Sequence, residues 1–399
     1  MEKTIVELFA GVGGFRLGFE KASDEWKTVW FSQWEPEQKA QWAYNCYVSH
    51  WPEPSNLNSN IDISKVKKDS IPNHNILVGG FPCQDYSVAR PLSDSNGIRG
   101  KKGVLWWQIY ETVKNKTPAF ILLENVDRLL KSPASQRGRD FGIILFCLNE
   151  LGYDIEWRVI NAADYGGAQR RRRIFIFAWN RNTRYAKNIL DCPSQIIKGK
   201  GFFAKAFPIK AIFADINGSI LEENIYSISA KFKFQFENCG ICKAGKIFSA
   251  KAEPKVEPFI PIKNILQFNV DRKYYIDENR VKWEYLKGSK NEFRKHKNGH
   301  EYKYTEGAIA FPDSLDKPGR TMLTSESTVN RSSHVVTDLQ TGQIRKITPI
   351  EAERMQGFDD DWTNTGMTER ARYFCMGNAL VVPMVERMAH TLGEIVDAE

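Results

Sequence analysis

Residues 4–14, Thr-Ile-Val-Glu-Leu-Phe-Ala-Gly-Val-Gly-Gly, decide the fold that we expect for this chain. The apolar run from Thr4 to Phe9 predicts a buried strand, and the glycines after it lead into a helix predicted from Phe15 to Lys21. Glycines at such a turn let the backbone approach a ligand closely, and the start of the helix favours partial negative charge. The segment therefore suits nucleotide binding, although many α/β proteins have such a turn for packing alone.

Further apolar runs predict strands in the first half of the chain, at residues 28–32, 75–78, 119–123 and 174–178. A helix is expected after Asp140, which would serve as its N-cap, with Gly152 just beyond its end. Strands that alternate with helices predict an α/β domain with a mostly parallel sheet. In such sheets ligands bind beyond the carboxyl ends of the strands, so we expect the functional site at that edge.

The sequence pattern changes between about Arg184 and Val336, where helical periodicity fades and residues 232–248 alternate like a hairpin around Asn238 and Gly240. Residues 271–304 contain ten Lys or Arg, six Asp or Glu and seven aromatics. This mixture suits a surface that contacts phosphates and stacks on bases, but it equally fits a solvated basic face over a β core. Because helical character returns after Arg345, we divide the chain into residues 1–184, 185–338 and 339–399, with the outer two forming one domain.

Composition leaves the function open. The chain has 399 residues, 42% of them hydrophobic and 26% charged, with a formal net charge of +8. A basic excess suits a polyanionic partner but is also common elsewhere. Seven scattered cysteines argue against a disulfide framework and for a reducing compartment, so we expect a cytoplasmic protein. No apolar run is long enough to span a bilayer, and no signal peptide is evident.

Reactive side chains follow two of the predicted strands. Cys83, in Gly79-Gly80-Phe81-Pro82-Cys83-Gln84, lies in a loop that Pro82 restricts, and its thiol is placed as a nucleophile, although most cysteines are small buried hydrophobes. Glu124, in Glu124-Asn125-Val126, would point into the same cleft and could act as an acid toward a ring nitrogen. Taken alone, Glu124 could also be a surface or capping carboxylate.

Two further motifs offer groups that bind ligands. In Gln169-Arg170-Arg171-Arg172-Arg173, Arg171 and Arg173 point to one side of an extended chain and suit a carbonyl oxygen or a phosphate. A solvated basic run or a nuclear-import signal is the alternative, but the strand that follows argues against a free tail. In Gln33-Trp34-Glu35, a carboxylate could bind ribose hydroxyls and Trp34 could stack on adenine or be a core aromatic.

Taken in order, these motifs resemble the cytosine-5 DNA methyltransferases of restriction–modification systems. Residues 97–100 with 105–106, residues 345–349 through 353–358, and residues 377–383 agree with further family blocks, so the resemblance covers about residues 4–178 and 344–390. It implies a Rossmann-like S-adenosylmethionine-dependent methyltransferase fold with a mostly parallel sheet, plus a smaller, mainly β target-recognition domain at residues 185–338.

The resemblance also implies roles for the reactive groups. The Cys83 thiolate would add to C6 of a cytosine, Glu124 would contact N3, and Arg171 or Arg173 would contact the O2 carbonyl. The target base lies inside duplex DNA and must be flipped out. Gln84, Ser87 and the loop toward Arg99 would then close over the flipped base.

S-adenosylmethionine is the implied cofactor. The residues expected to bind it are Phe9, Gly11, Gly13, Gly14, Trp34, Glu35, Asp62, Pro82, Asn378 and Leu380. The family usually has an acid just before the stacking residue, whereas Gln33 stands there in this chain, so the ribose contact stays open between Gln33 and Glu35. Cys239 and Cys242 have the spacing of half a zinc site, but without partner ligands we predict no metal.

The resemblance assigns DNA sequence recognition to the insertion. The residues expected to contact DNA there are Lys282, Arg294, Lys295 and Lys297. The implied partners are double-stranded DNA and, if the chain belongs to a restriction system, a cognate restriction endonuclease that shares the target site. A transfer-RNA cytosine methyltransferase, an inactive DNA-binding relative and a nicotinamide oxidoreductase are the rival functions. The long insertion, and intact Cys83, Glu124 and Arg171, favour a DNA methyltransferase over them.

Overall fold

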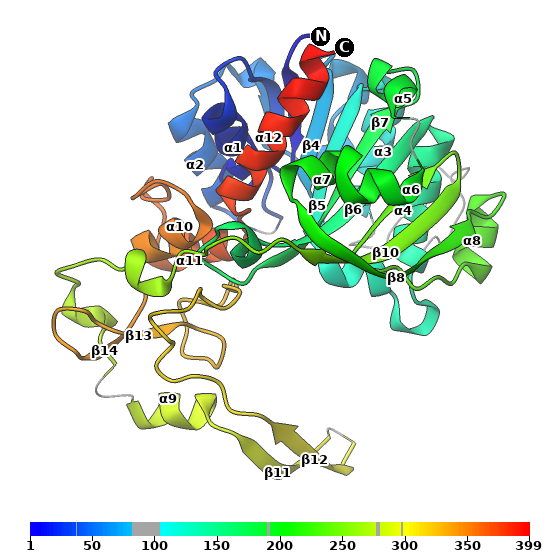
Figure 1. Cartoon of the computed structure of the whole chain (residues 1–399). Helices are drawn as coiled ribbons and strands as arrows, with labels where there is room; N and C mark the ends of the chain where they lie inside the picture. Colours follow the sequence, from blue (N-terminus) through cyan, green and yellow to red (C-terminus); the bar gives the residue numbers. More distant parts are fainter. Residues whose placement is uncertain (37, 82–103, 190–191, 277–279, 297) are drawn as a thin grey trace.

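The computed structural model describes residues 1–36, 38–81, 104–189, 192–276, 280–296 and 298–399 (Figure 1). Its centre is a ten-stranded sheet with the order β3-β2-β1-β4-β5-β7-β6-β9-β10-β8. The strands are β1 Thr4–Leu8, β2 Lys27–Ser32, β3 Asn58–Ser59, β4 Ile76–Gly80, β5 Phe120–Val126, β6 Tyr153–Asn161, β7 Arg172–Asn180, β8 Ile209–Ile220, β9 Cys239–Lys243 and β10 Lys246–Pro254. From β3 to β5 neighbouring strands run parallel, and from β5 to β8 they run antiparallel. The predicted α/β fold with a parallel sheet at its core is confirmed, and the antiparallel extension adds to it.

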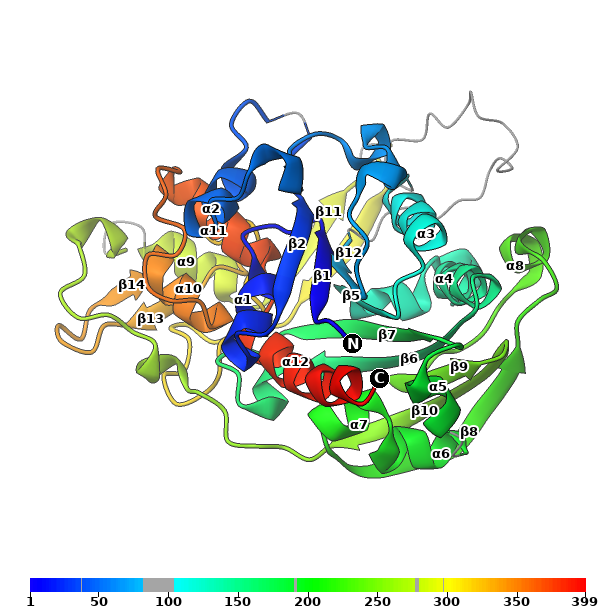
Figure 2. The same ribbon diagram turned by 90° about the horizontal axis from the view of Figure 1, so that it is seen from above.

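Helices cover both faces of this sheet (Figure 2). The helices in the described part of the chain are α1 Gly14–Ala22, α2 Trp42–His50, α3 Val104–Lys116, α4 Arg139–Glu150, α5 Arg184–Asn188, α6 Pro193–Gln195, α7 Phe202–Ala206, α8 Ile225–Lys231, α9 Arg280–Lys287, α10 Pro349–Gln356, α11 Glu369–Asn378 and α12 Val382–Asp397, and α9 among them lies away from the sheet. One apolar cluster joins α3 and α4 to one face, and another joins α1, α7 and α12 to the opposite face. No helix of the described residues is long and apolar enough to cross a membrane.

The C-terminal helix α12 returns to the first helix of the chain. A Cβ atom on Gly18 of α1 would lie 2.6 Å from Val385 of α12, so only glycine permits this close approach. The contact buries the apolar side of α12 on the same face of the sheet as Phe15 and Phe19. It also brings residues 378–380, which precede α12, next to the glycine turn that follows β1.

The strands predicted from apolar runs are present as β1, β2, β4, β5 and β7, whereas β6 was not predicted. The helix expected after Asp140 is α4, but its N-cap is Gly138 in a left-handed conformation (φ 86°). Asp140 lies inside the first turn, where its carboxylate accepts a hydrogen bond from Ser132 Oγ. The prediction of Asp140 as the cap was therefore wrong by two residues, because its side chain is used for the contact with Ser132.

The predicted hairpin is present, but its turn lies further along the chain. β9 and β10 are joined by Ala244 and Gly245, both with positive φ (47° and 76°), which is typical of the two-residue turns that match strand twist. The expected centre at Asn238 and Gly240 was wrong. β9 pairs with β6, so residues 209–254, which we assigned to the smaller domain, extend the main sheet. The division into domains stays a prediction, and these strands move its first boundary to about residue 255.

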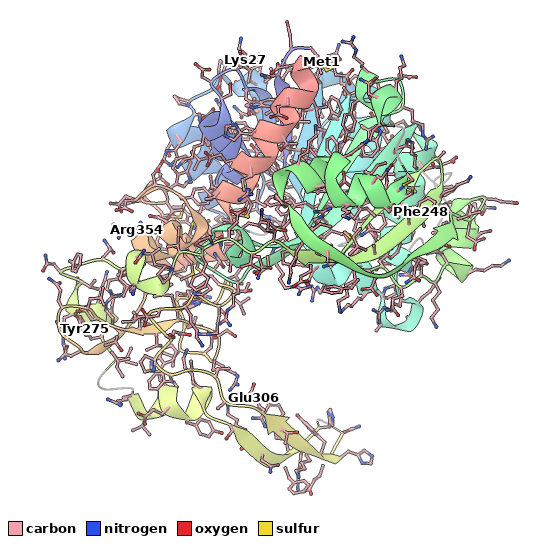
Figure 3. The ribbon with its side chains drawn as sticks, viewed as in Figure 1. Met1, Lys27, Phe248, Tyr275, Glu306 and Arg354 are labelled. Atoms are coloured by element: carbon pink, nitrogen blue, oxygen red, sulfur yellow. The ribbon has the colours of Figure 1, made fainter. Side chains whose placement is uncertain are left out.

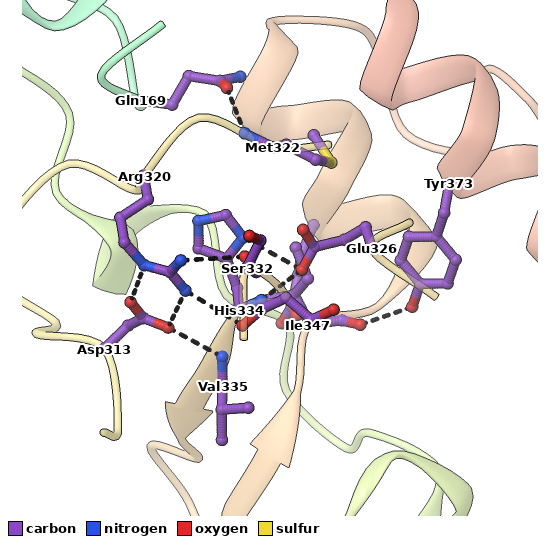
Figure 4. A network of polar contacts seen from close by, with 12 residues as sticks. Gln169, Asp313, Arg320, Met322, Glu326, Ser332, His334, Val335, Ile347 and Tyr373 are labelled. Carbon is purple, nitrogen blue, oxygen red and sulfur yellow. Dashed lines mark hydrogen bonds and ion pairs between the residues drawn. The ribbon is translucent and has the colours of Figure 1, made fainter. Parts of the chain in front are cut away.

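Residues 255–348 form a second lobe below the sheet edge at which β1, β4 and β5 end (Figure 1). It carries α9 and the short strands β11 Lys290–Lys295, β12 Glu301–Glu306, β13 Val335–Thr337 and β14 Ile344–Lys346. Between these elements the backbone is irregular and is fixed by buried polar contacts (Figure 4). Arg320 pairs with Asp313 at 2.8 Å and donates to the carbonyl of Ser332, while the N–H of Val335 donates to Asp313 at 3.0 Å.

Candidate active site and cofactor cavity

A cavity of about 410 Å³ lies at the carboxyl ends of the parallel strands. Its lining comes from the turn after β1 (residues 9–12, 14 and 15), the segment after β2 (33–36), the end of β4 (80–81), the end of β5 (124–126) and the junction of α11 with α12 (374, 375 and 377–380), with Ala43, Leu105 and Arg173. Its volume is in the range that holds a small ligand or cofactor. The cavity lies at the carboxyl-terminal edge of the parallel strands, which is the edge where the predicted α/β fold places a binding site.

The glycine turn forms the floor of the cavity. Gly11 has φ 58° and no atom within 4 Å of a built Cβ, and its N–H donates to Gln33 Oε1 at 2.7 Å. A Cβ on Gly14 would lie 3.2 Å from Leu380, so this glycine brings α1 close to the returning C-terminal segment. Gly13 does not line the cavity. With φ 87° and a Cβ position only 2.2 Å from the Trp51 ring, it supports the turn from beneath.

The residues after β2 place an aromatic face and two polar groups at the cavity. Trp34 is 40% exposed and lines the cavity, so it is not a core aromatic. Glu35 accepts the N–H of Ala43 at the start of α2 at 2.9 Å, and burial raises its pKa. Because Gln33 bonds to Gly11 and Glu35 bonds to α2, each is held in the wall of the cavity. Asp62, by contrast, does not line it and accepts the N–H of Ser64 at 2.9 Å.

Glu124 and Arg173 face each other at the other end of the cavity. Arg173 Nε lies 2.8 Å from Glu124 Oε1, and β5 and β7 pair side by side at this point. Burial raises the pKa of the Glu124 carboxyl, while Arg173 and Arg171 oppose the shift. Asn125, for which the sequence suggested no role, donates from Nδ2 to the carbonyl of Phe81 at 2.7 Å. It therefore holds Phe81, the residue that follows β4, against the end of β5.

Arg171 and Arg173 have different surroundings. Arg171 is buried, and its guanidinium donates to the carbonyls of Met322 (3.1 Å), Gly377 (2.9 Å) and Ala379 (2.9 Å). Arg171 thus ties β7 to the second lobe and to the cavity wall, and only Arg173 lines the cavity. Sequence reasoning could not separate the two, because both lie on one side of the strand.

Gln169 strengthens the same junction. Its Oε1 accepts the N–H of Met322 at 3.2 Å (Figure 4), and its Nε2 donates to the carbonyl of Met355 at 3.1 Å. Arg170 N–H donates to the carbonyl of Gly319 at 2.7 Å. The motif that carries the two arginines therefore also anchors the second lobe beside the cavity.

Several predicted site residues lie elsewhere. Pro82, Cys83, Gln84, Ser87, Arg99 and Lys297 lie outside the described residues. Lys282 is on α9, and Arg294 and Lys295 are on β11, all in the second lobe. By contrast, the predicted cofactor-binding residues Phe9, Asn378 and Leu380 do line the cavity. Cys239 and Cys242 contact opposite faces of the sheet, so they cannot chelate one ion together. Within the described ranges no group of His, Cys, Asp or Glu could hold a metal.

Comparison with known proteins identifies the family. The family model of C-5 cytosine-specific DNA methylases matches residues 3–394. Type II methyltransferase M.Sau3AI of Staphylococcus aureus is 49% identical over 398 residues, covering 98% of this chain and 95% of the relative. Type II methyltransferase M.SsoII of Shigella sonnei is 26% identical, covering 99% of this chain and 81% of the relative.

Solved structures agree on the fold. The Dnmt2 methyltransferase of S. pombe has a TM-score of 0.61 at 15% identity, with 99% of each chain covered. The methyltransferase EhMeth of Entamoeba histolytica has a TM-score of 0.59 at 18% identity, covering 100% of this chain and 99% of that chain. The chain therefore belongs to the C-5 cytosine-specific DNA methylase family and is a DNA (cytosine-5)-methyltransferase of the restriction–modification type.

Proposed function

We propose that the cavity binds S-adenosylmethionine and that Cys83, Glu124 and Arg173 carry out methylation of a cytosine flipped out of duplex DNA. One observation carries this proposal. Glu124 and Arg173 form an ion pair of 2.8 Å in the wall of a glycine-floored cavity, directly beside the segment that leads into Cys83. A carboxyl with a raised pKa and a guanidinium at one end of a cofactor-sized cavity suit a pyrimidine ring better than a nicotinamide.

The residues present fit the proposed cofactor. Gly11 leaves open space where a side chain would stand, Trp34 offers a ring face, and Phe9 and Leu380 add apolar walls. Gln33 and Glu35 both lie in the wall, so the ribose contact stays open between them. S-adenosylmethionine, when bound, supplies an electrophilic methyl group. Asp62 lies outside the cavity, which leaves its proposed adenine contact without support.

The chemistry of the chain's own groups follows from their types and surroundings. The Cys83 thiolate forms a bond with C6 of cytosine, which moves electron density to C5. The raised pKa of Glu124 favours its protonated form, so the carboxyl can donate to the ring N3 as that nitrogen gains charge. Arg173 is placed to contact the O2 carbonyl. After methylation a base removes the C5 proton, the bond from Cys83 to C6 breaks, and the thiolate is restored.

Arg171 acts in this proposal as a positioning residue. Two of its three bonds to backbone carbonyls hold Gly377 and Ala379 against the start of β7, next to Arg173 in the cavity wall. The bond to Met322 joins the same strand to the second lobe. We propose that the second lobe is the target-recognition domain. A cognate restriction endonuclease and a cytoplasmic location stay predictions.

The decisive experiment uses duplex DNA that contains 5-fluorocytosine at the target. Fluorine at C5 cannot leave as a proton, so the bond between Cys83 and C6 persists after methylation. We expect a covalent complex of protein, DNA and transferred methyl group, detectable by denaturing electrophoresis and mass spectrometry. Cys83→Ser should form none and turn over no substrate, while binding S-adenosylmethionine with nearly unchanged affinity. Methylation by that variant at a comparable rate, or transfer to transfer RNA in preference to duplex DNA, would refute the proposal.

A further inference from the structure

The strands β11 and β12 form a separate two-stranded ribbon that projects from the second lobe (Figure 1). Its pairs run from Lys290 with Glu306 at the base to Lys295 with Glu301 near the tip. An isolated two-stranded hairpin is only marginally stable in water, so contacts between its own side chains must supply the stabilisation that a third strand would give. The two faces of the ribbon differ in how they do this.

One face, which we call the paired face, is occupied by its own contacts. The Arg294 guanidinium lies 3.5 Å from the centre of the Tyr304 ring and 2.7 Å from Glu292. Lys290 pairs with Glu306 at 3.0 Å at the base. Because Arg294 is already stacked and paired, it stiffens the ribbon and is a poor candidate for a direct base contact.

On the opposite face, which we call the open face, most of the described side chains make no polar contact within the ribbon. It consists of Asn291, Phe293 and Lys295 on β11 and Glu301, Lys303 and Thr305 on β12, all of them exposed. Phe293 is 75% exposed. Within the described part of the chain, the side chains of Asn291, Lys303 and Thr305 have no hydrogen bond or ion pair. A stiff ribbon that leaves an aromatic ring, an amide and a cation unpartnered has the character of a binding surface.

The base of the ribbon is fixed to the buried contacts of the second lobe. Lys287, at the end of α9, is buried and donates to the carbonyl of Ser333 at 2.6 Å. Arg331 donates to the carbonyls of Leu286 (3.1 Å) and Gly288 (3.2 Å) and pairs with Glu306. These contacts continue into the Asp313 and Arg320 network, which adjoins the anchor at Gln169 (Figure 4). A continuous set of buried polar contacts therefore connects the base of the ribbon to Gln169 beside the cavity.

The dimensions of the ribbon match the major groove of DNA. A two-stranded ribbon fits a groove about 12 Å wide, and six residues of strand span about 20 Å, the length of about six base pairs. The amide of asparagine pairs with adenine in two bonds, lysine bonds to guanine or phosphate, and a threonine methyl or a phenylalanine ring packs on the thymine methyl. The minor groove, at about 6 Å, is too narrow for such a ribbon.

We propose that the open face of the β11–β12 ribbon enters the major groove and that Asn291, Phe293, Lys303 and Thr305 determine the target sequence. The inference rests on the proposed function, because it assumes duplex DNA as the substrate of the cavity. It changes the sequence-based assignment of Arg294, which becomes a positioning residue that holds the ribbon straight. Lys295 pairs with Glu301 at 3.3 Å on the same face and contributes through charge.

The test compares methylation of duplexes that differ by one base pair. The preferred sequence is first determined by bisulfite sequencing of a randomised duplex library treated with the wild-type protein. Asn291→Ala should lower kcat/KM on the preferred duplex about tenfold or more and change it little on a duplex already mismatched at one position, so that discrimination falls. Lys303→Gln should lower the slope of log affinity against log salt by about one. Lys27→Gln, an exposed strand lysine at the far end of the molecule (Figure 3), is the matched control and should change neither quantity.

The outcomes separate this inference from the proposed function. If Asn291→Ala, Phe293→Ala and Lys303→Gln all keep wild-type discrimination and salt dependence while methylation continues, the inference is overturned and the proposed function stands. If the wild-type protein methylates no duplex, the proposed function itself fails. A thermal unfolding curve that matches the wild type by circular dichroism shows that each variant, including its second lobe, is folded. Variants that lose binding to a protein partner but keep DNA discrimination would also overturn the inference.

Discussion

In the main sheet, Leu122 and Ile176 have no exposed surface and belong to large apolar clusters, whereas in the second lobe the charged side chain of Arg345 is equally buried. Arg345 lies 2.8 Å from Asp338 and 2.7 Å from Glu351. Apolar packing is non-directional and tolerates small adjustments, while a buried ion network keeps its geometry only if every partner is present. The cavity therefore sits on a sheet held mainly by apolar packing, whereas the ribbon sits on a lobe that depends on buried ion pairs.

The comparison is tested most strongly at Glu124. Glu124→Gln keeps the shape of the cavity but removes the acid, so we expect kcat to fall about 10²- to 10⁴-fold. Because the pKa of Glu124 is raised, its protonated form is lost as pH rises through that value, and wild-type kcat should show a corresponding decline that the variant lacks. Steady-state kinetics across pH measures both. Sequence discrimination should be unchanged, and a variant that loses discrimination as much as rate would contradict the separation of the two regions.

Removal of the buried cation tests the second lobe. Arg345→Ala leaves Asp338 and Glu351 buried without their partner, which should destabilise the lobe by about 3–5 kcal/mol. Thermal unfolding followed by circular dichroism should show an early transition, accompanied by loss of DNA binding. Affinity for S-adenosylmethionine, measured by calorimetry below that transition, should stay near the wild-type value. Equal loss of cofactor binding would mean that the cavity depends on the lobe.

The same network gives the lobe a dependence on pH. Although burial opposes it, the bond from Arg345 holds the pKa of Asp338 at about 2. A carboxyl with a lowered pKa contributes stability above its unfolded value of about 4, and that contribution is lost as pH falls toward 2. We expect a loss of roughly 2 kcal/mol over this window. Asp338→Asn should remove this part of the pH dependence, and an unchanged acid transition would place its cause elsewhere.

The smallest expected effect is at the aromatic wall of the cavity. Trp34→Ala removes a half-exposed ring face, so affinity for S-adenosylmethionine should fall about fivefold, in line with roughly 1 kcal/mol for aromatic stacking. Trp34→Phe keeps a ring and should recover most of the affinity. Calorimetric titration distinguishes the two. A Trp34→Ala protein that binds as tightly as the wild type would show that the ring only borders the cavity.

The parts that sequence predicted well are those in which one property governs the structure. The apolar strands and the glycine turn after Phe9 follow from hydrophobicity and backbone freedom. β6 was missed because Glu156 and Arg158 interrupt its apolar pattern, yet both are buried. Arg158 donates there to the carbonyls of Ile197 and Phe207, which no local pattern reveals.

The site shows the same division. The residues that line the cavity, such as Trp34 and Asn378, were identified from their places after strands and from resemblance. The different uses of Arg171 and Arg173 could not be, because one bonds to carbonyls more than 150 residues away in sequence. The stacking of Arg294 on Tyr304 was not predicted either, because it depends on the register in which β11 pairs with β12.

The return of α12 to α1 has a consequence for synthesis of the protein on the ribosome. The glycine turn and α1 are made first, but their partners Leu380 and Val385 emerge only after some 360 further residues, which takes roughly 20 to 70 seconds at the usual rate of translation. For that time the apolar side of α1 has no covering helix. The cofactor pocket of the nascent chain therefore stays incomplete until the C-terminal segment is made. We expect a molecular chaperone that shields the apolar side of α1 to raise the yield of active enzyme.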